Sequence, residues 1–270
     1  MNNIECIRAA KRIVVKVGTS TLAHPTGMIN IRAIEGLVKV LSDLKNAGRE
    51  VVLVTSGAIG VGMGKIKLKE RPSDTPSKQA LAAVGQCELM YAYDKLFQKH
   101  NHVVAQILLT GDILDSPKRK ANVVNTFERL LEMGAIPVIN ENDTVSVEEI
   151  EFGDNDTLSA IVARLCSADA LIILTDIDGL YDKDPHAHPD ACLIPHVSEI
   201  TDEIRALAGG RGSTLGTGGM MTKISAASLA LEKDIPVVIA NGHDPDVLYD
   251  LTDGKQAGTL FCPERLLSRT

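Results

Sequence analysis

The sequence predicts an α/β protein with an open, mainly parallel, doubly wound sheet, covered by helices on both faces to give a three-layer α/β/α sandwich. Short apolar runs alternate with segments of helical periodicity along most of the 270 residues. These runs are uniformly apolar, as is typical of strands that are buried on both faces. Hydrophobic residues make up 44% of the chain and charged residues 23%, which is enough apolar material for a sizeable core.

Six apolar runs are the predicted strands. They span residues 13–17, 51–54, 103–109, 136–139, 171–174 and 235–240. Helical periodicity between them predicts helices at about 34–44, 76–98, 124–131, 158–165 and 220–231. Gly48 suits the end of the first helix, because glycine readily takes the left-handed conformation found there. Strands and helices that alternate in this way predict a ligand at the carboxyl ends of the strands.

Nothing in the composition divides the chain, and we expect one domain with two lobes. The net charge of −7 and the pI near 5.5 argue against nucleic acid or an anionic membrane as the main partner. The sequence begins without a signal-peptide core and has no apolar run near ~18 residues, so a cytoplasmic protein is expected. Its five scattered cysteines lack a CxxC pair, which favours buried thiols over disulfides or a zinc site.

The segment 216–223, with the sequence GTGGMMTK, is the strongest indication of a ligand. Glycines let backbone N–H groups approach phosphate oxygens, and the N-terminus of a following helix adds about half a positive charge. Thr217 is the predicted N-cap of that helix. Lys223 lies early in the helix, where its charge opposes the helix dipole and calls for an anionic partner. A bound polyphosphate fits both features, and a solvated surface lysine is the alternative.

Two common phosphate-binding motifs do not match this sequence. Residues 60–65 (GVGMGK) resemble a P-loop, but the first glycine is one residue too close to the Gly-Lys pair and Ile66 replaces the Mg-binding Ser or Thr. Residues 16–20 (KVGTS) carry one glycine after the first strand, which removes the main support for dinucleotide binding of the usual kind. A different phosphate-binding fold is therefore needed.

Polar clusters gather where the predicted strands end. They occupy residues 16–20, 55–58, 140–143 and 175–176, and a fifth cluster at 153–156 opens a helix. Ser, Asp and Asn also cap helices and turns regardless of function, and an N-cap role is the alternative interpretation of Asp156. Five clusters that converge on one edge of a sheet nevertheless favour a ligand pocket.

Taken in order, these motifs resemble the amino acid kinase family. The resemblance covers about residues 11–262 and is carried by KVGTS (16–20), VTSGA (54–58), VINEND (138–143), GDND (153–156), LTD (174–176) and GTGGMMTK (216–223). It is closest to the members that act on L-glutamate. It implies the amino acid kinase fold and transfer of the γ-phosphoryl group of ATP to the side-chain carboxylate of L-glutamate, the first step toward proline.

The resemblance also implies roles for individual residues. The catalytic residues would be Lys16, Lys223 and Asp156, with the two lysines across the transferring phosphoryl group. Glutamate would be bound by Ser56, Gly57, Asp143 and Asn155. The nucleotide would be bound by Lys16, Thr175, Asp176, Thr217, Gly218, Gly219, Met220, Met221, Thr222 and Lys223. Residues 1–165 would form the acceptor-binding lobe and residues 166–270 the nucleotide-binding lobe.

Phosphoryl transfer between two anions spreads negative charge over the transition state, so positioning and cations supply most of the catalysis. Two lysines suit this demand. A carboxylate is already a nucleophile at neutral pH, and no general base is required. Mg²⁺, the expected cofactor beside ATP, would bridge phosphate oxygens and keep several waters, so no residue is predicted to be a metal ligand.

Several partners and properties are expected from the resemblance alone. They are a homo-oligomeric state, feedback inhibition by proline and transfer of the product to glutamyl phosphate reductase. Many bacterial members continue into a C-terminal RNA-modification-type (PUA) domain, whereas this sequence stops at Thr270. We therefore expect a chain without that domain.

Three alternatives to the glutamate assignment stay open. Acetylglutamate kinase and aspartokinase share the fold and the chemistry. Uridylate and carbamate kinases use other acceptors. A non-catalytic sensor of amino acids or nucleotides belongs to a different class, because a fold alone does not prove activity.

Overall fold

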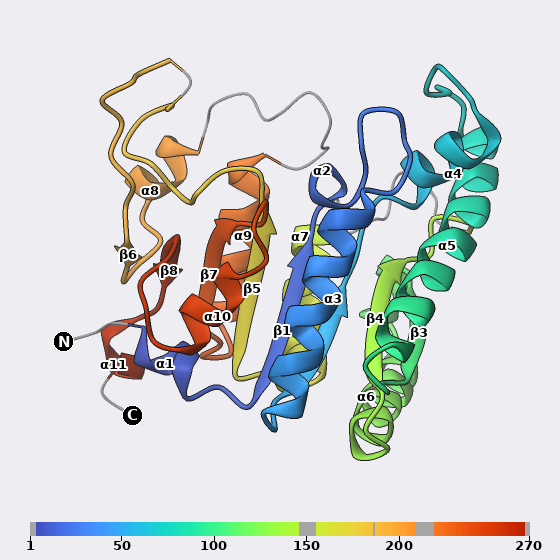
Figure 1. Ribbon diagram of the computed structural model, residues 1–270. Coiled ribbons are helices and arrows are strands. Elements are labelled where there is room, and N and C mark those ends of the chain that lie inside the picture. Colours follow the sequence, from blue (N-terminus) through green and yellow to red (C-terminus); the bar gives the residue numbers. More distant parts are fainter. Residues whose placement is uncertain (1–3, 146–154, 186, 209–218, 268–270) are drawn as a thin grey trace.

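The computed structural model describes residues 4–145, 155–185, 187–208 and 219–267, in which eight strands form one sheet (Figure 1). The strand order is β3-β4-β2-β1-β5-β7-β8-β6. The strands are β1 (Arg12–Val17), β2 (Glu50–Val54), β3 (Val104–Leu109), β4 (Ile136–Glu141), β5 (Ala170–Thr175), β6 (His196–Val197), β7 (Val237–Asn241) and β8 (Thr259–Phe261). Neighbouring strands run parallel except β7 and β8, which are antiparallel.

The longer helices are α3 (Ile31–Asn46), α4 (Ala58–Ile66), α5 (Thr75–Gln98), α6 (Pro117–Glu132), α7 (Asn155–Leu165) and α9 (Met220–Leu231). Shorter ones are α1 (Glu5–Arg8), α2 (Thr19–Leu22), α8 (Asp202–Leu207), α10 (Val247–Thr252), α11 (Glu264–Leu267) and the 3₁₀ turn η1 (Gly111–Ile113). Side chains cap several starts: Asn30 accepts from the Ala33 amide, Asp74 from Ser77, and Ser116 from Arg119. Pro76 and Pro117 then occupy the first turns of α5 and α6, where no amide hydrogen is needed.

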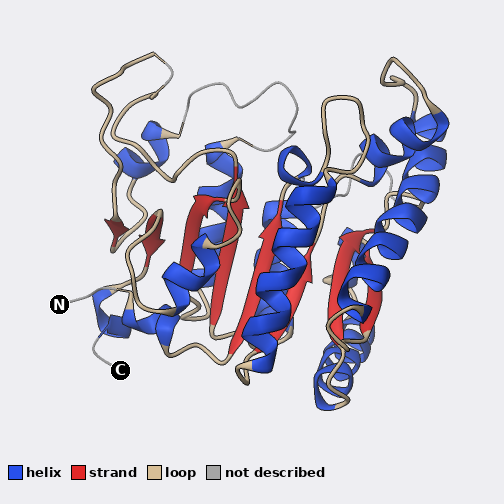
Figure 2. Cartoon of the chain, in the orientation of Figure 1, coloured by secondary structure: helices blue, strands red, loops and turns tan. Residues whose placement is uncertain are grey.

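Successive residues of each central strand pack on opposite faces of the sheet. In β1, Val14 joins a core with side chains of α6, α7 and α9, whereas Val15 and Val17 join a second core with α3, α5 and α10. Figure 2 shows the sheet as the middle layer between these helices. The predicted three-layer fold is confirmed.

The six predicted strands are all present, with boundaries that shift by one or two residues. The sequence analysis missed β6 and β8, which are only two and three residues long. It also missed α4, because a helix containing three glycines does not look like a helix in sequence.

The topology reverses direction between β1 and β5. Strand β1 lies between β2 and β5: the strands that follow it in sequence, β2 to β4, are on one side, and β5 to β8 are on the other. Lys16 is paired in register with Val54 of β2 and Ile173 of β5. Connections on the two sides of such a point leave in opposite directions, which opens a crevice beyond the carboxyl ends of the strands. The fold therefore places a ligand site next to the end of β1.

The first and last helices lie together at the opposite end of the sheet from this crevice (Figure 1). Helix α1 packs against α10 and α11, and the Cys6 and Cys262 sulfur atoms are 3.7 Å apart. The expectation of buried thiols is correct for Cys166 and Cys262 but wrong for Cys87 and Cys192, which are exposed. Across the described ranges, no helix is long and apolar enough to cross a membrane.

Helices α4 and α5 pack with their backbones in direct contact. A Cβ atom at Gly62 would lie 2.0 Å from the carbonyl oxygen of Leu81, and one at Gly85 would lie 1.7 Å from that of Ala58. Both distances are far below a van der Waals contact, so only glycine permits this approach. Gly62, the middle glycine of the segment that resembles a P-loop, therefore serves helix packing.

We predict that Gly62→Ala lowers the free energy of unfolding by about 3 kcal/mol, because it forces the two helices apart. Gly60→Ala is the matched control in the same helix, since its Cβ would meet no atom closer than Thr19 Cγ2 at 3.8 Å. This control should be neutral or stabilising by up to about 1 kcal/mol, because alanine favours a helix. Urea unfolding of the two variants measures the difference, and equal stabilities would contradict the packing argument.

Candidate active site

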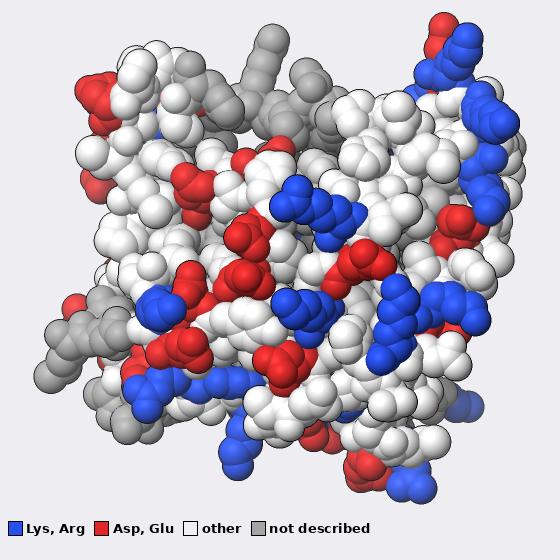
Figure 3. Space-filling model, viewed as in Figure 1, with Lys and Arg blue, Asp and Glu red and all other residues white. Residues whose placement is uncertain are grey.

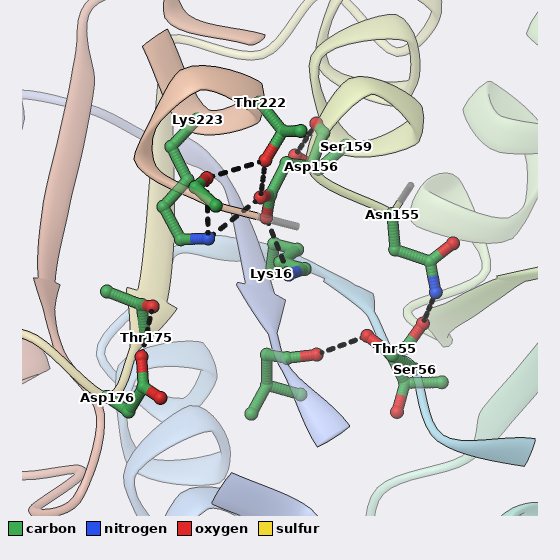
Figure 4. A network of polar contacts seen from close by, with 12 residues as sticks. Lys16, Thr55, Ser56, Asn155, Asp156, Ser159, Thr175, Asp176, Thr222 and Lys223 are labelled. Carbon is green, nitrogen blue, oxygen red and sulfur yellow. Dashed lines mark hydrogen bonds and ion pairs between the residues drawn. The ribbon is translucent and has the colours of Figure 1, made fainter. Parts of the chain in front are cut away.

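Three charged side chains from distant parts of the chain meet at the centre of the crevice. Lys16 Nζ lies 2.5 Å from Asp156 Oδ1, and Lys223 Nζ lies 3.0 Å from Asp156 Oδ2 (Figure 4). Lys16 is near the end of β1, Asp156 is in the first turn of α7, and Lys223 is the fourth residue of α9. Two cations around one anion leave a net positive charge, and this arrangement suits an additional anionic ligand.

All three groups are buried: 7% of Lys16, 1% of Asp156 and 6% of Lys223 is exposed. Burial by itself raises the pKa of Asp156, but the charges of Lys16 and Lys223 outweigh burial and hold it at about 2. Asp156 is therefore ionised at neutral pH. Thr222 adds a hydrogen bond, with its hydroxyl 2.9 Å from Asp156 Oδ2 and 2.7 Å from the Gly219 carbonyl oxygen.

The structure corrects the predicted N-cap at Thr217 and decides against the alternative N-cap role of Asp156. Helix α7 begins at Asn155, so Asp156 lies inside the first turn and is not the N-cap. Its charge is favourable there, because the N-terminus of a helix is partially positive. Helix α9 begins at Met220 with Gly219 as its N-cap, so the prediction of Thr217 as the cap is wrong. Lys223, whose charge opposes the α9 dipole, has the anionic partner Asp156.

The end of β2 turns sharply into α4 at Ser56 and Gly57. Gly57 has a φ of 95°, a left-handed conformation that favours glycine, and it is the N-cap residue of α4. No side chain caps α4, and its first residues, Ala58 and Ile59, line the cleft, so the uncapped backbone N–H groups of this helix start lie at the site. The Ser56 hydroxyl donates its proton to the Val17 carbonyl oxygen at 2.9 Å, which leaves its oxygen as an acceptor.

Asn155 lies beside this turn and is held by its amide nitrogen. Asn155 Nδ2 donates to the Thr55 carbonyl oxygen at 2.7 Å (Figure 4). It also donates to Asn140 Oδ1 at 2.9 Å. Asp143, which follows β4, lines the same cleft and is partly exposed. The four residues predicted to bind the acceptor thus lie on one side of the central lysines.

On the other side of Lys16, Thr175 is the last residue of β5 and Asp176 follows it directly. The Thr175 hydroxyl donates to Asp176 Oδ1 at 3.1 Å, and the Thr175 carbonyl accepts from the Gly242 amide at 2.7 Å. Gly219, Met220, Met221 and Thr222 surround the start of α9. Thr217 and Gly218 fall outside the described residues, as do residues 153 and 154 of the GDND motif, and their predicted roles stay predictions.

A cleft of about 940 Å³ joins both sides of the site. Its walls include residues from the ends of β1, β2, β4 and β5, as expected for polar clusters that converge on one edge of the sheet. The site residues that line it are Lys16, Ser56, Gly57, Asp143, Asn155, Asp156, Thr175, Asp176 and Lys223. The volume is at the upper end of the range for small-molecule sites and is enough for a nucleotide and a small acceptor together.

The sequence analysis missed one wall of this cleft. Residues 23–28 form part of this wall, and the α4–α5 connection adds Lys67, Lys69 and Arg71 to the rim. No sequence motif indicates that these three basic residues lie at the cleft. Figure 3 shows basic and acidic side chains interspersed over one face of the molecule, with basic residues along the edge that carries α4 and α5.

No group of three or more His, Cys, Asp or Glu side chains with the spacing of a metal site occurs among the residues that the structure describes. Asp156 could offer carboxylate oxygens to a cation, but Lys16 and Lys223 already neutralise it. A divalent cation would therefore find its ligands on a bound phosphate chain more readily than on these residues.

Comparison with known proteins identifies relatives over nearly the whole chain. The chain is 53% identical over 265 residues to "Glutamate 5-kinase" of Clostridium perfringens, covering 97% of this chain and 98% of that protein. It is 53% identical to the Listeria innocua protein of the same name, with 97% and 96% covered. Over 253 residues it is 54% identical to the Clostridium acetobutylicum protein of that name, with 94% and 95% covered.

Solved structures support the fold. The isopentenyl phosphate kinase of T. acidophilum superposes with a TM-score of 0.63 at 18% identity, covering 93% of this chain and 99% of that one. UMP kinase from Bacillus anthracis gives a TM-score of 0.64 at 18% identity, with 94% and 97% covered. The family model described as "Amino acid kinase family" matches residues 11–241, which include Lys16, Asp156 and Lys223. With this match and with whole-length relatives at more than half identity, the chain belongs to the amino acid kinase family.

Proposed function

We propose that this protein transfers the γ-phosphoryl group of ATP to the side-chain carboxylate of L-glutamate and forms L-glutamyl 5-phosphate. The observation that carries the proposal is the similarity to proteins named glutamate 5-kinase, which extends over nearly the whole of both chains. The buried Lys16–Asp156–Lys223 group supplies the cations that phosphoryl transfer to a carboxylate requires.

The transferring phosphoryl group would lie between the two lysine ammonium groups. Negative charge on its oxygens grows along the reaction, and preorganised cations in a buried site stabilise such charge strongly. Asp156 would not react itself. It would hold both ammonium groups near one point and prevent their mutual repulsion from separating them.

The acceptor side of the cleft would bind glutamate through groups of matching polarity. The Ser56 oxygen and the Asp143 carboxylate are acceptors suited to the α-ammonium group. The backbone N–H groups that begin α4 after Gly57 suit the α-carboxylate. The side-chain carboxylate would then extend toward Lys16 and Lys223.

ATP would occupy the other side, near Thr175, Asp176 and the start of α9. Mg²⁺ would accompany the nucleotide and neutralise part of the charge on its phosphates. The division into an acceptor lobe and a nucleotide lobe would follow the β1–β5 boundary, since residues 1–165 supply the strands on one side of it and residues 166–270 those on the other.

Three expectations rest on the family resemblance and stay predictions: inhibition by proline, a homo-oligomeric state and transfer of the product to a glutamyl phosphate reductase. The cytoplasmic location, expected from the sequence itself, also stays a prediction.

The test of this function is a turnover assay with Mg-ATP and four acceptors: glutamate, N-acetylglutamate, aspartate and UMP. We expect ADP release and hydroxylamine-trappable acyl phosphate with glutamate, at a kcat/KM at least about tenfold above the other acceptors. Preference for N-acetylglutamate or aspartate would reassign the acceptor. No turnover with any of them would favour a non-catalytic sensor.

We predict that Lys223→Ala lowers kcat by about 10²–10³, by analogy with the loss of one donor to a developing oxyanion. Lys16 still pairs with Asp156 in this variant, and the fold should survive. Lys233→Ala, an exposed lysine just beyond the same helix, is the matched control and should keep the wild-type kcat. Steady-state kinetics check this, and an unchanged kcat in folded Lys223→Ala would remove Lys223 from the catalytic group.

We predict that Asn155→Ala and Asp143→Ala each raise KM for glutamate about tenfold or more, with KM for ATP within about twofold of wild type. Thr175→Ala is the opposite control, because Thr175 lies on the proposed nucleotide side. It should raise KM for ATP and leave KM for glutamate unchanged. A rise in KM for ATP in the first two variants would move Asn155 and Asp143 to the nucleotide side.

A further inference from the structure

A chain of side-chain amides runs from the interior of α5 to the wall of the cleft. Gln86 Oε1, on α5, accepts from Asn140 Nδ2 at 2.8 Å. Asn140 Oδ1, on β4, accepts from Asn155 Nδ2 at 2.9 Å. Only 9% of Gln86 and 1% of Asn140 is exposed, and of the three only Asn155 is among the described residues that line the cleft.

Two backbone groups determine which way each amide in this chain points. The Glu141 N–H donates to Asn140 Oδ1 at 2.9 Å, and the Thr55 carbonyl accepts from Asn155 Nδ2 at 2.7 Å. A backbone amide can only donate and a carbonyl can only accept, so neither side chain can exchange its oxygen and nitrogen without breaking a bond. Asn140 therefore directs Nδ2, a donor, toward Gln86, and Gln86 accepts this hydrogen bond through Oε1.

This polarity determines what Asn155 offers to a ligand. Both hydrogens of Asn155 Nδ2 are used, one by Thr55 and one by Asn140. Asn155 Oδ1 makes no hydrogen bond to the described residues and is the atom that remains for a ligand. Asn155 is therefore fixed as an acceptor and suits a donor such as an ammonium group.

The Gln86 side chain, which accepts from Asn140, has a second polar group that destabilises the folded state. Its Nε2 is buried and has no hydrogen-bond partner among the described residues. A buried donor without a partner is unfavourable, and an apolar side chain of similar size would avoid the penalty. The requirement for an acceptor opposite Asn140 Nδ2 explains why a glutamine occupies this place.

We propose that Gln86 is a positioning residue for the acceptor amino acid. By accepting from the buried Asn140 Nδ2, it keeps the Asn140 side chain where its Oδ1 receives Asn155 Nδ2, and Asn155 Oδ1 is thereby held toward the α-ammonium group of the substrate. The proposal rests on the proposed function and adds a residue of α5 that does not touch the ligand.

The test compares Gln86→Met with Gln86→Glu. Methionine fills the space but cannot accept, so Asn140 Nδ2 loses its partner and KM for glutamate should rise about tenfold, the order expected for one lost hydrogen bond. The kcat and KM for ATP should stay within about twofold of wild type, because the lysine group is not involved. The side chain introduced by Gln86→Glu offers an acceptor oxygen whether or not it is protonated. This variant should therefore keep a KM for substrate glutamate close to that of the wild type.

Gln98→Met is the matched control, since it makes the same change at the exposed end of the same helix. It should leave all three kinetic constants unchanged. A merely structural role for Gln86 would lower thermal stability without separating the two KM values. If Gln86→Met does not fold, Gln86→Ala, which introduces no new atoms, takes its place with the same expectation.

Two results would overturn the proposal. One is a KM for glutamate unchanged in the folded variant, and the other is an equal rise in Gln86→Met and Gln86→Glu. Wild-type enzyme that does not turn over glutamate would refute the proposed function itself, before any variant is compared.

Discussion

The attraction between one buried carboxylate and two ammonium groups is the constraint on which this site depends. Lys16 and Lys223 carry like charges and, because both are buried, would repel each other strongly. Asp156 cancels this repulsion and ties the end of β1 to the first turns of α7 and α9. Pairing of the three charges offsets the desolvation free energy of burying them. The remaining net positive charge can attract an anionic ligand.

The order of the sheet makes this meeting possible. Because β5 pairs directly with β1, the residues after β5 face those after β1 across the reversal of topology. On the other flank, the tight packing of α4 on α5 brings the uncapped start of α4 and the amide of Gln86 to their places beside β2 and β4. The two flanks of the cleft are thus built differently: one by strand ends and a helix start, the other by backbone contact between two helices.

Much of this arrangement could be predicted from sequence, and the reasons are physical. The six main strands are buried on both faces, so each appears as an unbroken apolar run, and the polar clusters after them stand out clearly. These clusters, together with the family resemblance, are enough to predict the group of Lys16, Asp156 and Lys223.

Features that depend on tertiary contact have no recognisable pattern in the sequence. The glycines at 62 and 85 have meaning only when α4 and α5 meet, and Gln86 looks in sequence like any polar residue of a long helix. Short strands such as β6 and β8 depend on their neighbours and have no periodicity of their own.

The contact between the first and last helices has a practical meaning. Helices α1 and α11 touch at the end of the sheet opposite the cleft, and the sulfur atoms of Cys6 and Cys262 lie within reach of each other nearby. A fusion partner, a surface tether or a short peptide joining these two helices would therefore be attached on the side of the molecule that faces away from the substrates. The same proximity makes the chain a natural candidate for circular permutation, in which new ends are opened in an exposed loop while the sheet order stays the same.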